Sequence, residues 1–262
     1  MNKWVRKSIK LANSTGYLDK LFKIYPIEVG GTRNIPKDIK NKIQEAFKAK
    51  NEIDLIKKLL ELPKFPIDDP YISSLRRYPS LLLKNPETIR RISKRLFSMD
   101  VDTILELAEK PKSPSRQLGF SFKKWLRTLD YPFLQEDDFK KYNNIAFLDG
   151  SDKKLKEFAI KELGIKKLKK GIDFILKTQN KIILGEAKFL TDYGGTQNNQ
   201  FRDAINITRI NKNNVVGVSV IDGIVWFKSN TYMYKTIKSL QRIALSALLM
   251  EEFIKEQTLQ SY

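Results

Sequence analysis

The chain of 262 residues contains neither cysteine nor histidine. Without cysteine, the sequence excludes disulfide scaffolds, thiolate metal sites and cysteine nucleophiles. Without histidine, it excludes imidazole metal ligands, Ser-His-Asp triads and every nuclease chemistry that depends on histidine. Any catalysis must therefore use carboxylates, Lys, Arg, Tyr, Ser or Thr.

Long hydrophobic runs are also missing. No apolar run approaches the roughly 18 residues that a membrane-spanning helix needs. Residues 1–10 lack the apolar core of a secretory signal. These two absences predict a cytoplasmic protein without a membrane partner.

Basic residues are in large excess, with 49 Lys and Arg against 30 Asp and Glu and a formal charge of +19. The excess is spread over the chain, because residues 1–150 carry +11 and residues 151–262 carry +8. A hydrophobic content of 41% argues for a folded basic body rather than a disordered tail. Such a body favours a polyanion partner, nucleic acid first and an anionic membrane second. The plain alternative is a Lys-rich surface that reflects an AT-rich coding sequence.

The first part of the chain, residues 1–143, has a helical pattern. Four amphipathic segments are expected to be helices, at 37–48, 53–60, 86–97 and 101–108. The residues that favour a helix start at these segments are Pro36, Asn51, Pro86 and Asp100. Ile53, Ile56, Leu59 and Leu60 form the apolar face expected for the second of these helices. A further helix is expected at 118–129. The sequence thus predicts a helical N-terminal region over residues 1–143.

The pattern changes near residue 144. An apolar run at 145–148 and a helix from Ser151 or Asp152 to about residue 163 precede expected strands at 171–177 and 181–189. A helix at 196–207 follows, then two β-branched runs at 215–221 and 224–228 joined by a turn at Asp222 and Gly223. A last helix is expected at 237–257. This order predicts an α/β core over residues 144–262.

The residues that suggest chemistry lie on the two expected strands at 171–189. If the turn is centred on residues 179–180, the symmetric register places Asp173 opposite Glu186, with Lys188 on the same face as Glu186. Directly opposed residues have Cβ atoms about 4.5–5.5 Å apart, so two carboxylates there repel unless a cation separates them. Oxygen ligands without imidazole or thiolate favour Mg²⁺ or Mn²⁺.

Lys188 would add a point positive charge beside that cation. Together they would bind a phosphate, activate an attacking water and stabilise the developing pentavalent phosphorus. The neighbouring strand residues are apolar, and charges among them are costly unless paired or bound to metal. Two plain alternatives stay open, a solvated pair at a strand edge and a buried structural salt bridge between Asp173 and Lys188.

Asp173, followed thirteen residues later by Glu186-Ala187-Lys188 on an adjacent strand, resembles the PD-(D/E)XK nuclease core over about residues 145–228. The segment EAKFLTDYGGTQNNQFRDA is similar to the one that follows the catalytic strand in type II restriction endonucleases. The resemblance implies a central mixed sheet flanked by helices. One departure is Ile172, which stands where the motif has proline.

By the same resemblance, each residue of the motif has an expected role. Asp173, Glu186 and the backbone carbonyl of Ala187 would bind the metal, and Lys188 would be the catalytic lysine. Many members of the family also place an acidic residue on the helix before the first strand. Glu157 is the candidate for that position, with Glu162 behind it, and an ordinary solvated helix residue is the alternative.

The resemblance implies a prokaryotic type II restriction enzyme that hydrolyses double-stranded DNA with Mg²⁺, for which Mn²⁺ substitutes. It would leave 5′-phosphate and 3′-hydroxyl ends. A palindromic target would imply a homodimer, and a DNA methyltransferase would be encoded nearby without forming a stable complex. The alternatives are a structure-specific repair or junction nuclease, and a DNA-binding protein without catalytic activity.

Two groups of residues are candidates for contact with DNA. Gly194 and Gly195 precede a polar cluster whose amides suit adenine and whose helix start suits phosphate, with Arg202 nearby as a phosphate contact. The cluster consists of Thr196, expected as the helix cap, and Gln197, Asn198, Asn199 and Gln200. The second group is a basic stripe on the helix at 86–97, formed by Arg91, Lys94 and Arg95 with Arg90. It would make the helical region a DNA clamp or a dimerisation element. The alternatives are an ordinary polar loop and a solvated helix face.

Overall fold

A computed structural model describes residues 1–26, 34–110, 114–166, 168 and 171–259. The chain divides into two compact units. The sheet unit comprises Met1–Ile27 and Ser113–Tyr262, and the helical unit comprises Glu28–Lys112. This division differs from the expected boundary at residues 143 and 144. The reason is that Trp4, Tyr17 and Phe122 are buried in the core of the sheet unit.

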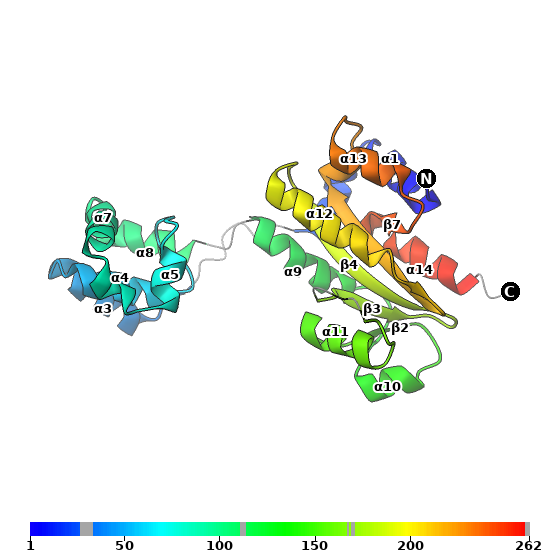
Figure 1. Cartoon of the computed structure of the whole chain (residues 1–262), viewed down its shortest axis with the longest axis horizontal. Helices are drawn as coiled ribbons and strands as arrows, with labels where there is room; N and C mark the ends of the chain where they lie inside the picture. The colour runs from blue at the N-terminus through cyan, green and yellow to red at the C-terminus, as the bar shows by residue number, and fades with distance from the viewer. Residues whose placement is uncertain (27–33, 111–113, 167, 169–170, 260–262) are drawn as a thin grey trace. The chain divides into compact units, whose positions relative to one another are not determined.

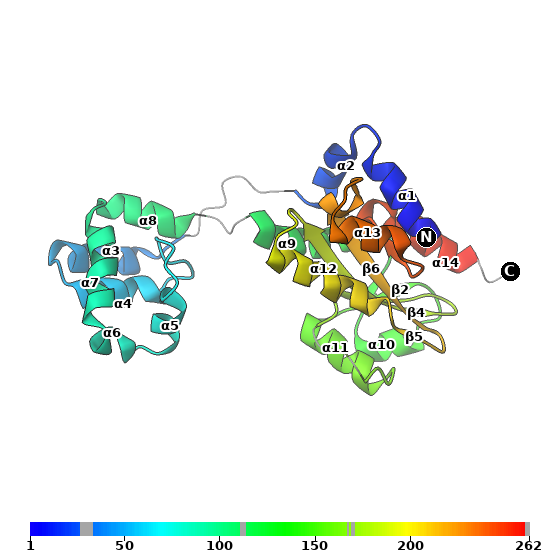
Figure 2. The same ribbon diagram turned by 45° about the horizontal axis from the view of Figure 1, so that its top comes forward.

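The helical unit, whose helices are labelled in Figure 2, has its own hydrophobic core, which includes Ile43, Leu59 and Ile92. Its helices are α3 (Lys37–Lys48), α4 (Glu52–Glu61), α5 (Ile72–Arg77), α6 (Leu81–Lys84), α7 (Pro86–Phe97) and α8 (Val101–Glu109). The four helices expected in this region are therefore confirmed.

The expected caps of two of these helices are confirmed as well. The Asn51 side chain accepts a hydrogen bond from the backbone N–H of Asp54, and Asp100 accepts one from Thr103. The expected burial of Ile53 is wrong, because this side chain is exposed and Leu55 is buried instead. The apolar face of α4 is thus rotated from the one that the sequence suggested.

The sheet unit begins with α1 (Lys3–Ala12), α2 (Tyr17–Ile24) and α9 (Pro114–Leu126). These are followed by β1 (Phe133–Leu134), α10 (Glu136–Lys141), β2 (Ala146–Leu148), α11 (Asp152–Lys161), β3 (Phe174–Lys177) and β4 (Ile182–Leu190). The remaining elements are α12 (Gly195–Ile207), β5 (Asn211–Lys212), β6 (Val215–Gly223), the 3₁₀ helix η1 (Ile224–Trp226), α13 (Tyr232–Ser239), β7 (Ala244–Leu245), the 3₁₀ helix η2 (Ala247–Leu249) and α14 (Met250–Leu259).

Within the described residues, the strands form one mixed sheet of seven strands (Figure 1). The order is β1-β2-β3-β4-β6-β5, and β7 also pairs with β6. The β3–β4 pair is antiparallel, whereas β4 and β6 are parallel, with α12 as the connection between them. The expected mixed α/β architecture is confirmed. No helix in the described part of the chain is both long and apolar enough to cross a membrane.

The strands of the sheet are buried on both faces because helices cover them. Ile183 of β4 packs in a core with residues of α1, α2, α9, α13 and α14, whereas the next residue, Leu184, packs in a second core with residues of α11. Successive strand residues point to opposite faces. Because both faces are buried, the sequence of β4 is apolar at most positions. Charged residues on such a strand need a specific partner.

The register of β3 and β4 is the one expected from the sequence. Phe174 pairs with Gly185 and Lys177 with Ile182, so the same register places Asp173 opposite Glu186. The N–H of Asp173 donates to the Gly185 carbonyl at 2.9 Å. A Cβ atom at Gly185 would lie 2.0 Å from the ring of Phe174, so the ring packs where only glycine leaves room. This contact fixes the pairing directly beside the two carboxylates.

Two expectations for the C-terminal third are wrong. The expected turn at Asp222 and Gly223 lies inside a longer strand, β6, which ends at Gly223 with φ +92° and passes into η1. The expected helix at 237–257 is divided into α13, β7, η2 and α14. The apolar residues Ala244 and Leu245 satisfy either pattern, and burial against β6 as a strand decides between them.

Asp222 is fully buried and joins three parts of the sheet unit. Its carboxylate accepts hydrogen bonds from the hydroxyls of Tyr25 (2.8 Å), Tyr17 (3.3 Å) and Ser246, and from the N–H of Ala247 (3.1 Å). Burial raises the pKa of Asp222 to about 6, although these hydrogen bonds oppose the shift. The network connects α2, β6 and η2, so we expect it to be a main determinant of stability.

Replacing Asp222 by Ala removes the acceptor that four buried donors share. Because a buried donor without a partner keeps its full desolvation cost, we expect the free energy of unfolding to fall by about 3–5 kcal/mol. Urea unfolding followed by circular dichroism measures this change. Asp130→Ala, at an exposed position, is the matched control and should shift stability by less than about 0.5 kcal/mol. An equal effect of both variants would contradict the role of the network.

Asp222 also predicts a pH dependence of stability. Its pKa is about 6 in the folded protein and about 3.9 in an unfolded chain, so the folded state binds this proton more tightly. Its favourable contribution is therefore complete below about pH 4 and is lost as the pH rises to about 6. The stability difference between the wild type and Asp222→Asn should change in this direction by up to about 3 kcal/mol. Urea titrations between pH 4 and pH 7 measure it, and a difference independent of pH would contradict the assignment.

Candidate active site

Three charged side chains meet where β3 and β4 begin to separate. Glu186 and Lys188 lie on the same face of β4, and Asp173 lies directly before β3. Their side chains are largely buried, with exposed fractions of 16% for Asp173, 9% for Glu186 and 26% for Lys188. The N–H of Ala187 donates to Asp173 Oδ2 at 2.8 Å, which orients this carboxylate toward β4.

The amine of Lys188 lies among oxygen atoms of Asp173, Glu186 and the backbone of Ala187. Its Nζ is 2.6 Å from Glu186 Oε1, 3.0 Å from the Ala187 carbonyl oxygen and 3.6 Å from Asp173 Oδ2. These are the three groups that the sequence suggested as metal ligands. The structure brings all of them around one positive centre, which is the arrangement that a small cation requires.

The pKa values show how the charges balance. Burial raises the pKa of Glu186 and the nearby charge of Asp173 adds to this, while Lys188 opposes it without cancelling it. Burial lowers the pKa of Lys188, but Asp173 and Glu186 more than offset this effect, so its pKa is raised. Lys188 therefore keeps its proton at neutral pH. Burial is the main cause of the shift of Glu186 and the charge of Asp173 adds to it, so a cation bound beside both carboxylates would stabilise their charged forms.

Lys123 of α9 also belongs to this cluster, and the sequence gave no reason to select it. Its Nζ lies 3.3 Å from Asp173 Oδ1 and also pairs with Asp152 at the start of α11. It lies 50 positions before Asp173 in a Lys-rich chain, so only the packing of α9 against β4 reveals it. Asp203 of α12 was missed for the same reason, and its charge contributes to the raised pKa of Glu186.

Glu157 is not part of the cluster. It lies on the exposed face of α11 and is 3.8 Å from Lys153, one turn away on the same helix. Glu162 pairs with Lys140 at 2.9 Å. Among the described residues, no group of three or more acidic side chains is placed to hold a metal ion. An ion at this site would therefore rest on Asp173, Glu186 and a backbone carbonyl.

The cluster is open to a narrow cavity. Asp173 and Lys188 line it together with Tyr25, Leu118 and Phe122. The cavity has a volume of about 20 Å³, and Glu186 is not among the residues that line it. Asp173 and Lys188 are therefore accessible from one side, whereas Glu186 lies deeper.

The expected helix cap after β4 is wrong. Gly194 is the N-cap of α12, with φ −64° in the ordinary extended region, and Thr196 lies exposed in the first turn. The Gln197 side chain donates to the hydroxyl of Thr191 at 3.3 Å, and Asn198 donates to the carbonyl of Tyr193 at 3.0 Å. These two amides hold the segment before α12, so they are less available to a ligand than the sequence suggested.

The other candidates on α12 are more accessible. Asn199 is exposed and Gln200 is half-buried. Arg202 is exposed, and its guanidinium carbon lies 5.4 Å from the ring centre of Tyr232. The first turns of α12 therefore combine polar side chains with one cation.

The basic stripe lies on α7 of the helical unit. Arg91 forms an ion pair with Asp69, and Arg95 lies 3.9 Å from the same carboxylate. Lys94 is exposed on the same helix. Two of the three cations thus have an acidic partner within the unit, which reduces the charge that they offer to DNA.

Comparison with known proteins gives one match. A family model described as Tsp45I type II restriction enzyme matches residues 2–257. No curated protein and no solved structure matches the chain significantly. The matched range covers nearly the whole chain, including both units, and it confirms the expected type II restriction endonuclease. The chain therefore belongs to the Tsp45I type II restriction enzyme family and is a site-specific deoxyribonuclease.

Proposed function

We propose that the sheet unit is a PD-(D/E)XK nuclease core in which Asp173, Glu186 and Lys188 cut double-stranded DNA with Mg²⁺ as the cofactor. Mn²⁺ would substitute for Mg²⁺. The observation that carries the proposal is the position of the Lys188 amine among the oxygens of Asp173, Glu186 and Ala187. The raised pKa of Glu186 agrees with it, because burial and the nearby Asp173 both disfavour the charged carboxylate, and a divalent ion would offset both effects.

The donor atoms fit such an ion. Type II restriction enzymes typically use divalent metal ions, and Mg²⁺ binds through one or two carboxylates while keeping several waters. Asp173, Glu186 and the Ala187 carbonyl would hold it, and Lys188 would leave Glu186 to make room. When bound, the ion would polarise the phosphate and lower the pKa of a water molecule.

Lys188 would act as a charge rather than as a base, because its raised pKa keeps it protonated. Its ammonium group would bind a non-bridging oxygen of the phosphate and stabilise the negative charge that grows there. The carboxylate of Asp173 or Glu186 would orient a water molecule in line with the leaving O3′. The water oxygen bonds to phosphorus and its proton passes to solvent, while the bond from phosphorus to O3′ breaks and O3′ takes a proton from solvent. The products are a 5′-phosphate and a 3′-hydroxyl.

Lys123 would be a positioning residue. It pairs with Asp173 from the side opposite Lys188 and also pairs with Asp152. It thereby connects α9 and α11 to the catalytic strand pair. We infer that it holds the Asp173 carboxylate in place while Lys188 changes partner.

Specificity and assembly follow from the action on double-stranded DNA. The polar residues at the start of α12 would read bases, with Thr196 and Asn199 the most exposed of them. The basic stripe of α7 would clamp the DNA or contribute to a dimer. A palindromic target would be cut by a homodimer with one site for each strand. A DNA methyltransferase encoded nearby would protect the host DNA, and the enzyme would act in the cytoplasm.

Removing either central residue should abolish cleavage. Glu186→Gln removes a negative ligand and Lys188→Ala removes the ammonium, and we expect each to lower the cleavage rate by about 10²-fold or more. Plasmid DNA incubated with protein and Mg²⁺ under single-turnover conditions measures the rate. Glu252→Gln, an equal change at an exposed position of α14, is the control and should retain the wild-type rate.

The pattern of products tests the class of nuclease as well. Discrete fragments that disappear in both variants support the proposal. Random nicking by the wild type would favour a repair or junction nuclease. Binding of DNA without cutting by the wild type, or full activity of Glu186→Gln, would contradict the proposed site.

A further inference from the structure

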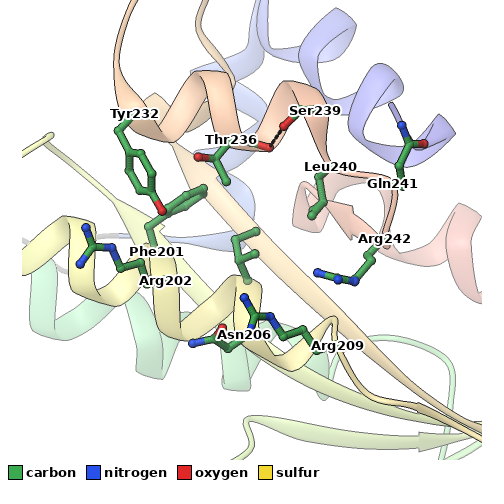
Figure 3. A pocket seen from close by; sticks show the side chains of 11 residues that line it. Phe201, Arg202, Asn206, Arg209, Tyr232, Thr236, Ser239, Leu240, Gln241 and Arg242 are labelled. Atoms are coloured by element: carbon green, nitrogen blue, oxygen red, sulfur yellow. Dashed lines mark hydrogen bonds between the residues drawn. The ribbon is translucent and has the colours of Figure 1, made fainter.

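A second feature of the sheet unit is a pocket of about 510 Å³ between α12 and α13 (Figure 3). Its floor includes the side chains of Phe201 and Leu240, both buried. Three arginines, Arg202, Arg209 and Arg242, line its walls. The volume is in the range of pockets that hold small organic ligands rather than single ions.

The charge of this pocket is of one sign. None of its lining residues is Asp or Glu. Among the residues that the structure describes, the three arginines make no ion pair with a carboxylate, in contrast to Arg91 on α7. Figure 3 shows Arg209 and Arg242 extending into the same opening from opposite sides. Three exposed guanidinium groups around one space make the local potential positive, which favours an anion there.

The pocket is also rigidly built. The N–H of Asn2 donates to the Leu240 carbonyl at 2.8 Å, and the Asn2 side chain donates to the Gln241 carbonyl at 3.2 Å. On the other side of Arg242, the N–H of Ser219 in β6 donates to the Ile243 carbonyl at 3.1 Å. The backbone that carries Arg242 is therefore fixed before a ligand binds, which lowers the entropic cost of binding.

The pocket and the candidate active site share one helix. Asp203 of α12 acts on Glu186 electrostatically, whereas its neighbour Arg202 and also Arg209 line the pocket. The arginine pocket and the candidate active site therefore border the same helix, and one DNA duplex is long enough to contact both.

We propose that this pocket binds a sugar–phosphate segment of the DNA backbone away from the phosphodiester that is cut. Guanidinium groups bind phosphate oxygens in pairs, and the apolar floor accepts the carbon atoms of a deoxyribose. The shared chemistry is a phosphate ester on a sugar, and a free nucleotide carries it too. The inference takes only its ligand, DNA, from the activity of the family and does not depend on the catalytic roles proposed above.

The test compares two double variants that remove the same charge. Arg209→Gln with Arg242→Gln empties the pocket walls of two cations while keeping polar side chains. Lys235→Gln with Lys238→Gln removes two exposed cations from α13 that do not line the pocket. Binding of an arbitrary 30-base-pair duplex is measured by fluorescence anisotropy without divalent metal at several salt concentrations. Circular dichroism and thermal melting establish that both variants are folded.

The salt dependence decides the outcome. Each lost phosphate contact lowers the slope of log K against log salt by about 0.9, so the arginine variant should lose about 2 from the slope and bind more weakly. The lysine variant should lose less than half as much. Equal losses in the two variants would overturn the proposal.

A further experiment tests whether the pocket binds a free nucleotide instead of DNA. If deoxyadenosine monophosphate raises the melting temperature of the wild type but not of the arginine variant, and both bind the duplex with the same slope, the pocket serves a free nucleotide and the proposal is wrong. Plasmid cleavage by the wild type separates the two hypotheses. If the wild type cleaves DNA and the arginine variant keeps the wild-type salt slope, only the pocket proposal is refuted. If the arginine variant has a lowered slope but the wild type does not cleave, only the catalytic proposal is refuted.

Discussion

Two carboxylates held face to face on paired strands are the constraint on which the structure of this site depends. Asp173 and Glu186 are opposed because the ring of Phe174 packs over Gly185 in the register next to them. A shift of one residue would turn Asp173 to the other face of the sheet and bury its charge in the core. The two carboxylates are largely buried, so water relieves their repulsion only in small part. Lys188 and Lys123 relieve it in this structure.

Much of this site could be predicted from the sequence because it depends on local geometry. The symmetric turn at residues 179–180 determined the β3–β4 register, and alternation along β4 placed Glu186 and Lys188 on one face. Lys123, Asp152 and Asp203 could not be predicted, because helices distant in sequence bring them to the site and nothing in their local pattern distinguishes them. The exposure of Glu157 could not be predicted either, because it depends on the phase of α11, which the local sequence does not determine.

In the fold, too, features set by the local sequence could be predicted, whereas features set by contacts between distant segments could not. The helix starts at Asn51 and Asp100 follow from side chains that cap their own helix, and the structure confirms them. The boundary between the units could not be predicted, because α1, α2 and α9 have ordinary helical patterns and only their burial against the sheet assigns them to it. Asp222 resembled a turn residue in the sequence. Its actual role depends on Tyr17, Tyr25 and Ser246, which lie far from it in the chain.

The basic residues of the chain differ in whether acidic side chains of the protein neutralise them. Some cations, such as Arg91, are neutralised within the protein, whereas the arginines beside α12 surround a space without acidic residues. α12 thus contributes residues both to the surroundings of the proposed active site and to the basic pocket. A nuclease needs both, because the phosphate backbone must be held by cations while the cut phosphate meets carboxylates that recruit a metal.

Direct titration of Mn²⁺ into the protein, followed by electron paramagnetic resonance, tests the central claim without relying on cleavage. The account predicts that the wild type binds Mn²⁺ and that Asp173→Asn combined with Glu186→Gln loses this binding. Glu252→Gln should bind Mn²⁺ as the wild type does. Equal binding by the double variant and the wild type would show that the opposed carboxylates are not a metal site and would contradict the account.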